Sequence, residues 1–172
     1  MSRPGVQSSE QRIIHQADLS DLRDRHAGQQ IVLASGCFDI IHKGHIYFLK
    51  AAATQGDILV VGVNSDRSVR GLKGPSRPIV VAADRCAVLA ELACVDYVFT
   101  YDEPCAGASI RLLRPNVFAV GVDSIGHYPD EIEAARAVGS RVYEIAKTPS
   151  SSTSSIIKLI RGQTWKHGER VT

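Results

Sequence analysis

The sequence predicts an α/β fold, a single Rossmann-like, doubly wound domain with about five parallel strands. Three observations support this prediction. Apolar runs of strand length alternate with segments of helical periodicity along most of the 172 residues. The run DILVVGV over 57–63 has no polar alternation, which is typical of a strand covered on both faces of a parallel sheet. The chain length and a hydrophobic content of 44% suit one domain with a sizeable core.

Individual elements can be placed from the apolar pattern and from the residues that end helices. A short charged helix is predicted over 18–25, ended by Gly28, and a first buried strand over 31–35. The later predictions, in chain order, are a helix over 44–55, a strand over 57–63, a loop over 70–78, a helix over 81–92, a strand over 95–100, a helix over 109–114, a strand over 117–120, a helix over 130–138, a strand over 141–145 and a helix over 156–161. We expect one domain over 13–162, between a mobile N-terminal tail of residues 1–12 and a C-terminal tail of residues 163–172.

Composition and charge argue against several classes of protein. A net charge of +2, with no long run of Lys or Arg in the core, gives no footprint for nucleic acid or for a membrane surface. No apolar run reaches the roughly 18 residues of a membrane span, and the first residues lack the apolar centre of a secretory signal, so we expect a cytoplasmic protein. The four cysteines have no paired spacing, which disfavours a zinc site or a disulfide framework. Small anionic ligands remain possible partners.

The segment GCFDIIHKGH over 36–45 joins the first predicted strand to the following helix. Gly36 lets the backbone approach a ligand closely, and the helix that begins near Gly44 points unpaired N–H groups at the same space. His42 and His45 are three residues apart, so their rings face the same side if the turn is helical. Two imidazoles at an anion site suggest phosphate recognition and charge stabilisation. Metal ligation would need a third ligand, and two exposed loop histidines are the plain alternative.

Four segments carry a resemblance to a known family. CFDIIHKGHIYFLKAA resembles the hallmark of the cytidylyltransferase-like nucleotidyltransferases, in which Phe-Asp and two apolar residues precede His-x-Gly-His. VNSDRSVRGLKGPSRPI and DRCAVLAELACVDYV resemble the bacterial heptose 1-phosphate adenylyltransferases, which make ADP-heptose. SSTSSIIKLI is similar to the closing Ser-Thr-Thr motif, which opens the last helix of the family. Together these segments span about 31–161, in the order and spacing of the family.

The resemblance implies a reaction in which a phosphate oxygen of an acceptor attacks the α-phosphorus of a nucleoside triphosphate and pyrophosphate leaves. Such transfers depend mainly on positioning and charge stabilisation. The resemblance implies catalytic roles for His42, His45 and Lys73. Nucleotide contacts are expected at Gly36, Cys37, Phe38, Gly44, Gly121, Asp123, Ser152, Thr153 and Ser154, and acceptor contacts at Asp39, Arg85 and Lys147. Asp39 has the alternative role of ordering its loop.

The resemblance also implies partners for the chain. Mg²⁺ is expected as the companion of the triphosphate, without a cage of protein ligands. A phosphorylated small molecule is expected as the acceptor, and a homodimer as the assembly. The plain alternatives are that Lys73 and Arg77 are solvated loop charges, that Arg85 pairs with an acid on a helix surface, and that the Ser-rich run is a linker.

The segment VGVDS over 120–124 departs from the heptose branch, which usually carries Lys-Gly-Gly-Asp followed by an aromatic residue. A valine replaces the lysine, a serine replaces the aromatic residue, and about three extra residues precede Pro129. His127 or Tyr128 could restore the ring. Lys147 stands where the related glycerol 3-phosphate cytidylyltransferases carry an arginine, so it could restore the cation.

These features favour ATP and a sugar 1-phosphate such as heptose 1-phosphate as the substrates. A rival enzyme hypothesis is a cytidylyltransferase that uses CTP with glycerol phosphate, another polyol phosphate or a phosphonate. A hypothesis of another class is a catalytically degenerate protein that binds a nucleotide without turnover. Pyrophosphate release separates the enzyme hypotheses from the last one.

Overall fold

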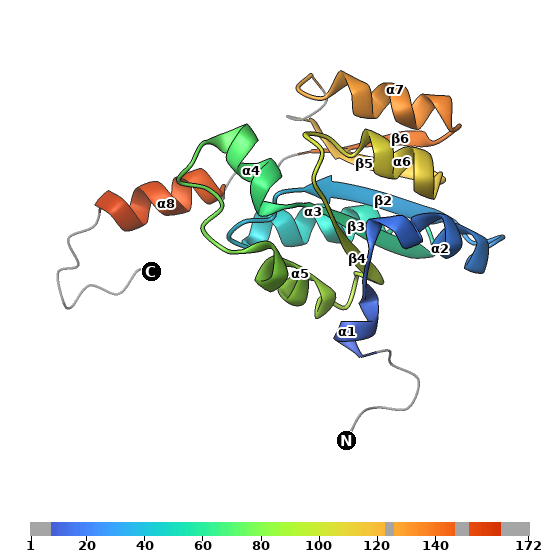
Figure 1. Cartoon of the computed structure of the whole chain (residues 1–172), viewed down its shortest axis with the longest axis horizontal. Helices are drawn as coiled ribbons and strands as arrows, with labels where there is room; N and C mark the ends of the chain where they lie inside the picture. The colour runs from blue at the N-terminus through green and yellow to red at the C-terminus, as the bar shows by residue number, and fades with distance from the viewer. Residues whose placement is uncertain (1–7, 123–125, 147–151, 163–172) are drawn as a thin grey trace.

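The computed structural model describes residues 8–122, 126–146 and 152–162, and its centre is a six-stranded sheet (Figure 1). The strands are β1 (Ile13–Ile14), β2 (Ile31–Gly36), β3 (Ile58–Asn64), β4 (Tyr97–Tyr101), β5 (Val117–Gly121) and β6 (Arg141–Ile145). Their order in the sheet is β1-β4-β3-β2-β5-β6, and every neighbouring pair is parallel. The predicted α/β fold with a parallel sheet is therefore confirmed, with six strands where about five were expected.

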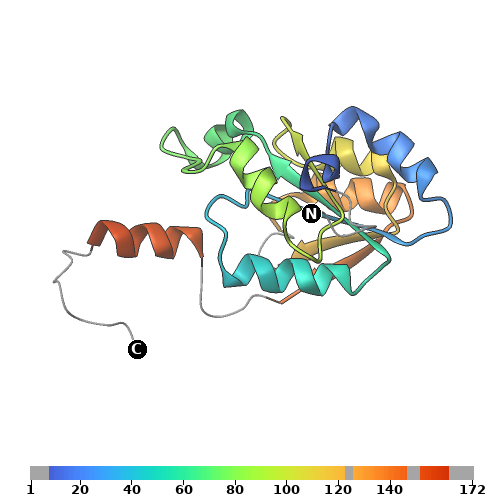
Figure 2. The same ribbon diagram turned by 90° about the horizontal axis from the view of Figure 1, so that it is seen from below.

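Helices cover both faces of this sheet (Figures 1 and 2). The described helices are α1 (Ser9–Arg12), α2 (Leu19–Arg25), α3 (Lys43–Ala53), α4 (Asp66–Lys73), α5 (Ala82–Ala90), α6 (Gly107–Leu113), α7 (Pro129–Ala137) and α8 (Thr153–Gly162), with a short 3₁₀ helix η1 (Gln16–Asp18). Helix α8 has no buried residue and extends away from the sheet (Figure 1). Side chains of α3 and α5 share one apolar cluster with the sheet, and those of α2, α6 and α7 share the other. Strand β2 is buried on both faces, since Val32 and Ala34 face the first cluster while Ile31 and Leu33 face the second.

The order of the strands fixes where a ligand can bind. Strand β2 pairs with β3 on one side and with β5 on the other, so the direction in which the chain winds reverses between β2 and β5. In such sheets a crevice opens beyond the carboxyl ends of the strands at this switch point. The segment that carries the two histidines follows β2 directly, so it lies at this position.

Two predictions about the N-terminal half were wrong. Residues 9–12 form a helix within the expected tail, because the Arg12 guanidinium donates to the carbonyl oxygens of Ala90 (3.1 Å) and Val95 (3.3 Å). The expected loop 70–78 is helical over its first half, because α4 runs to Lys73 and is capped by the Ser65 hydroxyl.

Within the described residues, no helix has the length and apolar character needed to cross a membrane.

Candidate active site

The chain turns sharply between β2 and α3. Phe38 has a φ of 46°, which a bulky side chain rarely adopts and which costs on the order of 1–3 kcal/mol. Its ring is buried in the core, which offsets this cost. Gly36 is needed here because a Cβ at this position would meet the Phe38 ring at 3.2 Å. The turn sends Asp39 toward the loop that follows α4, and it places the two histidines at the start of α3.

The predicted meeting of the two histidines is present in the structure. His42 is the N-cap of α3, and its Nδ1 accepts a hydrogen bond from the Gly44 N–H at 3.1 Å. In the neutral ring the proton therefore lies on Nε2, where it can be donated to a ligand. The His45 ring stacks on the His42 ring, with 3.8 Å between centroids and 23° between planes. The Gly44 N–H is taken by His42, so Gly44 does not offer its amide to a nucleotide as predicted.

Both histidines are held neutral at pH 7. Burial lowers the pKa of His45 to about 4, and repulsion from Lys73 and from the protonated form of His42 adds to this effect. Burial also lowers the pKa of His42. His45 Nδ1 is buried and has no hydrogen-bond partner among the described residues. An anion close to these rings would raise both pKa values and stabilise the protonated forms.

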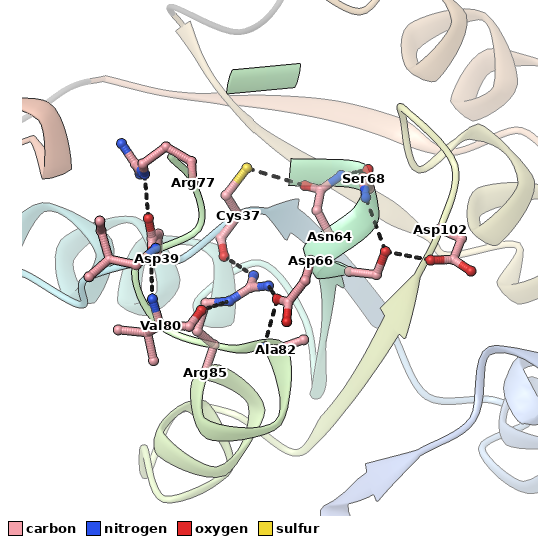
Figure 3. Close-up of polar contacts among 12 residues, drawn as sticks. Cys37, Asp39, Asn64, Asp66, Ser68, Arg77, Val80, Ala82, Arg85 and Asp102 are labelled. Atoms are coloured by element: carbon pink, nitrogen blue, oxygen red, sulfur yellow. Dashed lines mark hydrogen bonds and ion pairs between the residues drawn. The ribbon is translucent and has the colours of Figure 1, made fainter. Parts of the chain in front are cut away.

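Asp39 orders the loop after α4, which was one of its two predicted roles. Its carboxylate is 1% exposed and accepts hydrogen bonds from the N–H groups of Ile79 and Val80, both at 2.8 Å (Figure 3). The Arg77 guanidinium donates to the same carboxylate at 2.6 Å. Burial alone would raise the pKa of Asp39, but the two backbone N–H groups and Arg77 together hold it below its usual value.

Arg85 was predicted to bind the acceptor, and the structure places it elsewhere. Its side chain is 1% exposed, and its guanidinium donates to the carbonyl oxygens of Cys37 and Val80 and to the Asp66 carboxylate (Figure 3). A buried cation is stable only when its donors are paired, and here they are taken up by the protein. Asp66 also accepts from the Ala82 N–H at 2.8 Å, so this cluster joins α4 to α5 beneath the turn. Arg85 is a positioning residue for the backbone at Cys37.

A partly open pocket of about 150 Å³ lies at the carboxyl ends of β2, β3, β4 and β5, and we call it the strand-end pocket. Gly36, Cys37 and Gly121, all predicted to contact a nucleotide, are part of its lining. The lining also includes Ser35, Asn64, Lys73, Tyr101, Tyr128 and Glu131. Its walls therefore combine one cation, one carboxylate and several neutral hydrogen-bonding groups.

A second, wider cavity of about 540 Å³ lies between α8 and the loop after α4, and we call it the cationic groove. Four cations line it, namely Lys73, Arg77, Lys158 and Arg161. The Nη2 atom of Arg77 is buried and has no hydrogen-bond partner among the described residues. A cavity with several converging cations suits a polyphosphate.

The Ser-rich segment opens helix α8, as its motif predicted. The Ser152 hydroxyl accepts from the Ser155 N–H at 3.1 Å, so Ser152 caps the helix. Thr153 is the first residue of α8, and Ser154 lines the cationic groove. The predicted contacts at Asp123 and Lys147 lie outside the described residues.

Lys73 connects the two cavities. It lines both the strand-end pocket and the cationic groove, and its charge acts on His45. The backbone at Phe38 was predicted to line the nucleotide, and the Phe38 ring packs in the core and supports His45 edge-on at 5.3 Å between centroids. The site therefore has a polar pocket on one side, a cationic groove on the other, and Lys73 between them.

Several lining residues were not predicted from the sequence, and Glu131 is the most informative of them. It lies on α7 one turn before Ala134 and Ala135, which are fully buried. An acid in this position is on the apolar face of its helix, and that pattern is the signal that could have identified it. The sequence places Arg77 in a predicted loop and Arg161 at the end of a predicted helix, and neither position identifies a residue that lines a cavity.

The comparisons with known proteins agree with this arrangement. The model of the cytidylyltransferase-like family matches residues 33–159. The chain is 44% identical over 137 residues to the bifunctional protein HldE of Methylobacillus flagellatus and 43% identical over 136 residues to that of Helicobacter pylori. These alignments cover 78% and 79% of this chain, which spans only 28% of each relative.

Two solved structures share the fold. The lipopolysaccharide core biosynthesis protein from Thermoplasma volcanium superimposes with a TM-score of 0.61 at 28% identity, over 72% of this chain and 100% of that chain. The pantoate-beta-alanine ligase from Francisella tularensis superimposes with a TM-score of 0.54 at 12% identity, over 80% of this chain and 67% of that chain. At this low identity the ligase shows the fold alone. The family match, the HldE relatives and the paired histidines together show that the chain belongs to the cytidylyltransferase-like family of nucleotidyltransferases.

Proposed function

We propose that this protein transfers AMP from ATP to a sugar 1-phosphate such as heptose 1-phosphate and releases pyrophosphate. The observation that carries the proposal is that Lys73 lines both cavities and lies close enough to His45 to lower its pKa. In-line transfer of a nucleotidyl group needs an acceptor phosphate, an α-phosphate and a leaving pyrophosphate close together. One lysine between a polar pocket and a cationic groove can hold these charges side by side.

The geometry supports a division of roles. The cationic groove suits the β- and γ-phosphates, because Arg77, Lys158 and Arg161 converge there with Lys73. The Nε2–H of His42 is left to donate to a phosphate oxygen, and His45 lies directly beside it. As charge develops on the transferred group, the Nε2–H of His42 and a proton taken up from solvent by one of the two rings can stabilise it. No covalent intermediate is needed in this reaction.

The relatives support ATP as the nucleotide and a sugar phosphate as the acceptor. The HldE proteins match over the part of the chain that resembles heptose 1-phosphate adenylyltransferases, and a lipopolysaccharide biosynthesis protein is among the structural neighbours. This chain spans 28% of those relatives, so its activity corresponds to one part of a longer protein. The resemblance also implies a homodimer, which light scattering of the purified protein would test.

Mg²⁺ is part of the proposed reaction as the companion of the triphosphate. Mg²⁺ commonly binds through substrate phosphates and keeps several waters, with one or two carboxylates at most. Within residues 8–122, 126–146 and 152–162, no three His, Cys, Asp or Glu side chains form a metal-binding group. When bound with ATP, the ion would neutralise charge on the phosphates that face the cationic groove.

The test is pyrophosphate release with Mg²⁺, crossing ATP, CTP, GTP and UTP with heptose 1-phosphate, other sugar 1-phosphates and glycerol 3-phosphate. The proposal predicts that ATP with a sugar 1-phosphate is the fastest pair. Faster release with CTP and glycerol 3-phosphate would refute it and support the cytidylyltransferase alternative. Nucleotide binding without release from any pair would support the degenerate nucleotide-binding protein instead.

A further inference from the structure

The strand-end pocket is too small for a nucleoside. Its volume of about 150 Å³ lies below the roughly 300–1,000 Å³ of most ligand sites, so it suits one sugar ring or a short polyol. The lining groups of the pocket come mainly from the strand ends and from α7. Lys73 is the cation that the pocket shares with the cationic groove. A small, hydroxylated molecule that carries one phosphate matches this distribution of charge.

Among the described residues, Glu131 is the one carboxylate in this lining. It is 5% exposed, and one of its oxygens accepts a hydrogen bond from the Ala106 N–H at 2.7 Å. Among the described residues it forms no ion pair. A buried carboxylate without a cation is costly unless several donors satisfy it, so Glu131 has capacity for further hydrogen bonds. Burial raises its pKa, which reflects this shortage of partners.

The groups around Glu131 complement a pair of neighbouring hydroxyls. The Ser35 side chain, which also lines the pocket, interacts with both Glu131 and Tyr101 and lowers the pKa of each, against the larger effect of burial. Burial raises the pKa of Tyr101 well above its ordinary value, so its hydroxyl stays protonated and can donate. A carboxylate that accepts and hydroxyls that donate can bind both hydrogen-bonding functions of a vicinal diol.

Asn64, which also lines the pocket, is held in place by its own hydrogen bonds. Its side chain is buried, and its amide nitrogen donates to the Ser68 hydroxyl at 3.0 Å (Figure 3). Ser68 in turn donates to the Glu103 carbonyl oxygen at 2.8 Å, and the Cys37 thiol lies 3.6 Å from the Asn64 amide oxygen. A wall fixed in this way discriminates between ligands by shape as well as by charge.

We propose that the strand-end pocket binds the hydroxylated part of the acceptor, and that Glu131 accepts hydrogen bonds from its hydroxyls while Lys73 holds its phosphate. This inference rests on the proposed function and names the residue that selects the acceptor. A site built to bind hydroxyls rejects analogues that lack them, because its buried polar groups are then left unpaired. A phosphate without a polyhydroxylated group should therefore bind poorly in this pocket.

Glu131 also has a structural role, because its bond to Ala106 caps the start of α6. The variant that separates the two roles is Glu131→Gln, in which the amide oxygen can still accept from Ala106 while the negative charge is lost. Glu133→Gln is the matched control, since Glu133 is an exposed acid on the same helix. Tyr101→Phe removes one hydroxyl from the pocket and provides a second, independent variant. Circular dichroism would show that each variant is folded.

The test is calorimetric binding of glucose 1-phosphate, heptose 1-phosphate and inorganic phosphate to the full chain with Mg²⁺ and a non-hydrolysable ATP analogue. Glu131→Gln should weaken sugar phosphate binding by about 10-fold to 100-fold, the effect of one or two hydrogen bonds to a charged group. Its affinity for the ATP analogue and for inorganic phosphate should change less than about twofold. Tyr101→Phe should weaken sugar phosphate binding in the same direction, and Glu133→Gln should match the wild type.

Three results would overturn the inference. The first is that sugar phosphates bind the wild type no more tightly than inorganic phosphate, and the second is that both Glu131→Gln and Tyr101→Phe bind sugar phosphates as the wild type does. The third is that Glu131→Gln loses as much affinity for the ATP analogue as for the sugar phosphates. Because binding is measured without turnover, it is independent of the reaction. Binding that depends on Glu131 without pyrophosphate release from any pair would refute the proposed function and leave this inference standing.

Discussion

Replacing Asp39 with asparagine tests whether the loop after α4 is held by one buried charge. The variant keeps the shape of the side chain and one oxygen for the N–H groups of Ile79 and Val80. It loses the charge that faces Arg77, whose side chain is 11% exposed. A hydrogen bond to a charged group contributes about 1.5–3 kcal/mol, and breaking a buried ion pair costs about 3–5 kcal/mol. Since Arg77 keeps some contact with water, we expect a loss of about 3 kcal/mol.

The assay is urea unfolding of both proteins at several pH values. The pKa of Asp39 is lowered in the folded protein from an ordinary value of 3.8. Its contribution is therefore fully present above pH 3.8 and is lost as the pH falls through the lower pKa of the folded state. The difference in unfolding free energy between wild type and Asp39→Asn should be constant from about pH 7 to 5 and should shrink below pH 3.8.

An exposed acid serves as the control for this experiment. Asp102 pairs with Arg67 at 3.1 Å, and both side chains are largely exposed. Because exposed pairs contribute about 0–1 kcal/mol, Asp102→Asn should cost at most about 1 kcal/mol. Equal effects of the two substitutions at pH 7, or a difference that grows as the pH falls, would refute the reasoning about Asp39.

Three further predictions concern the proposed catalytic groups. His45→Ala should lower kcat for pyrophosphate release by about 10² to 10³ with unchanged circular dichroism, and a wild-type rate would contradict its role. Lys73→Ala should raise KM for both ATP and the acceptor, because Lys73 lines both cavities, while Arg70→Ala on the exposed side of α4 should change neither. Binding of the ATP analogue at pH 6 should take up protons, because the pKa of His45 rises from about 4 near phosphates. Calorimetry in buffers of different ionisation enthalpy measures this uptake, and proton release would contradict it.

Local patterns in the sequence predicted most of the fold and the central motif. Long apolar runs and helix-ending residues placed β2, β3, β5 and β6 to within about two residues, which is the usual uncertainty of element ends. Strand β1 has two residues and therefore no alternation to detect. The last turn of helix α4 was predicted as a loop because the segment 70–78 holds two glycines, two prolines and three basic residues. In the structure a Cβ at Gly71 would meet nothing within 4 Å, so this glycine lies on an open surface of the helix.

The roles of individual charged residues could not be predicted in the same way. Arg77 and Arg85 lie eight residues apart, and the sequence predicted a ligand contact only for Arg85. Their roles depend on packing: Arg85 is enclosed by Cys37, Val80 and Asp66, whereas Arg77 keeps a free Nη2 beside the cationic groove among the described residues. The burial of the Asp39 carboxylate likewise favours its role in ordering a loop over the predicted contact with the acceptor. Such distinctions come from segments that are distant in sequence and meet only in the folded chain.

The difference between this chain and the heptose branch at 120–124 affects the lining of the strand-end pocket. The heptose branch that the sequence resembles usually has a lysine where this chain has Val120, and Val120 lines the strand-end pocket together with Glu131. A lysine at that position would bring an ammonium group to the same wall and could pair with the carboxylate. With valine there, no described residue neutralises Glu131, and its hydrogen-bonding capacity is available to a ligand. Because the substitution lies in the strand-end pocket and not in the cationic groove, we expect it to change which acceptor is bound more than which triphosphate is used.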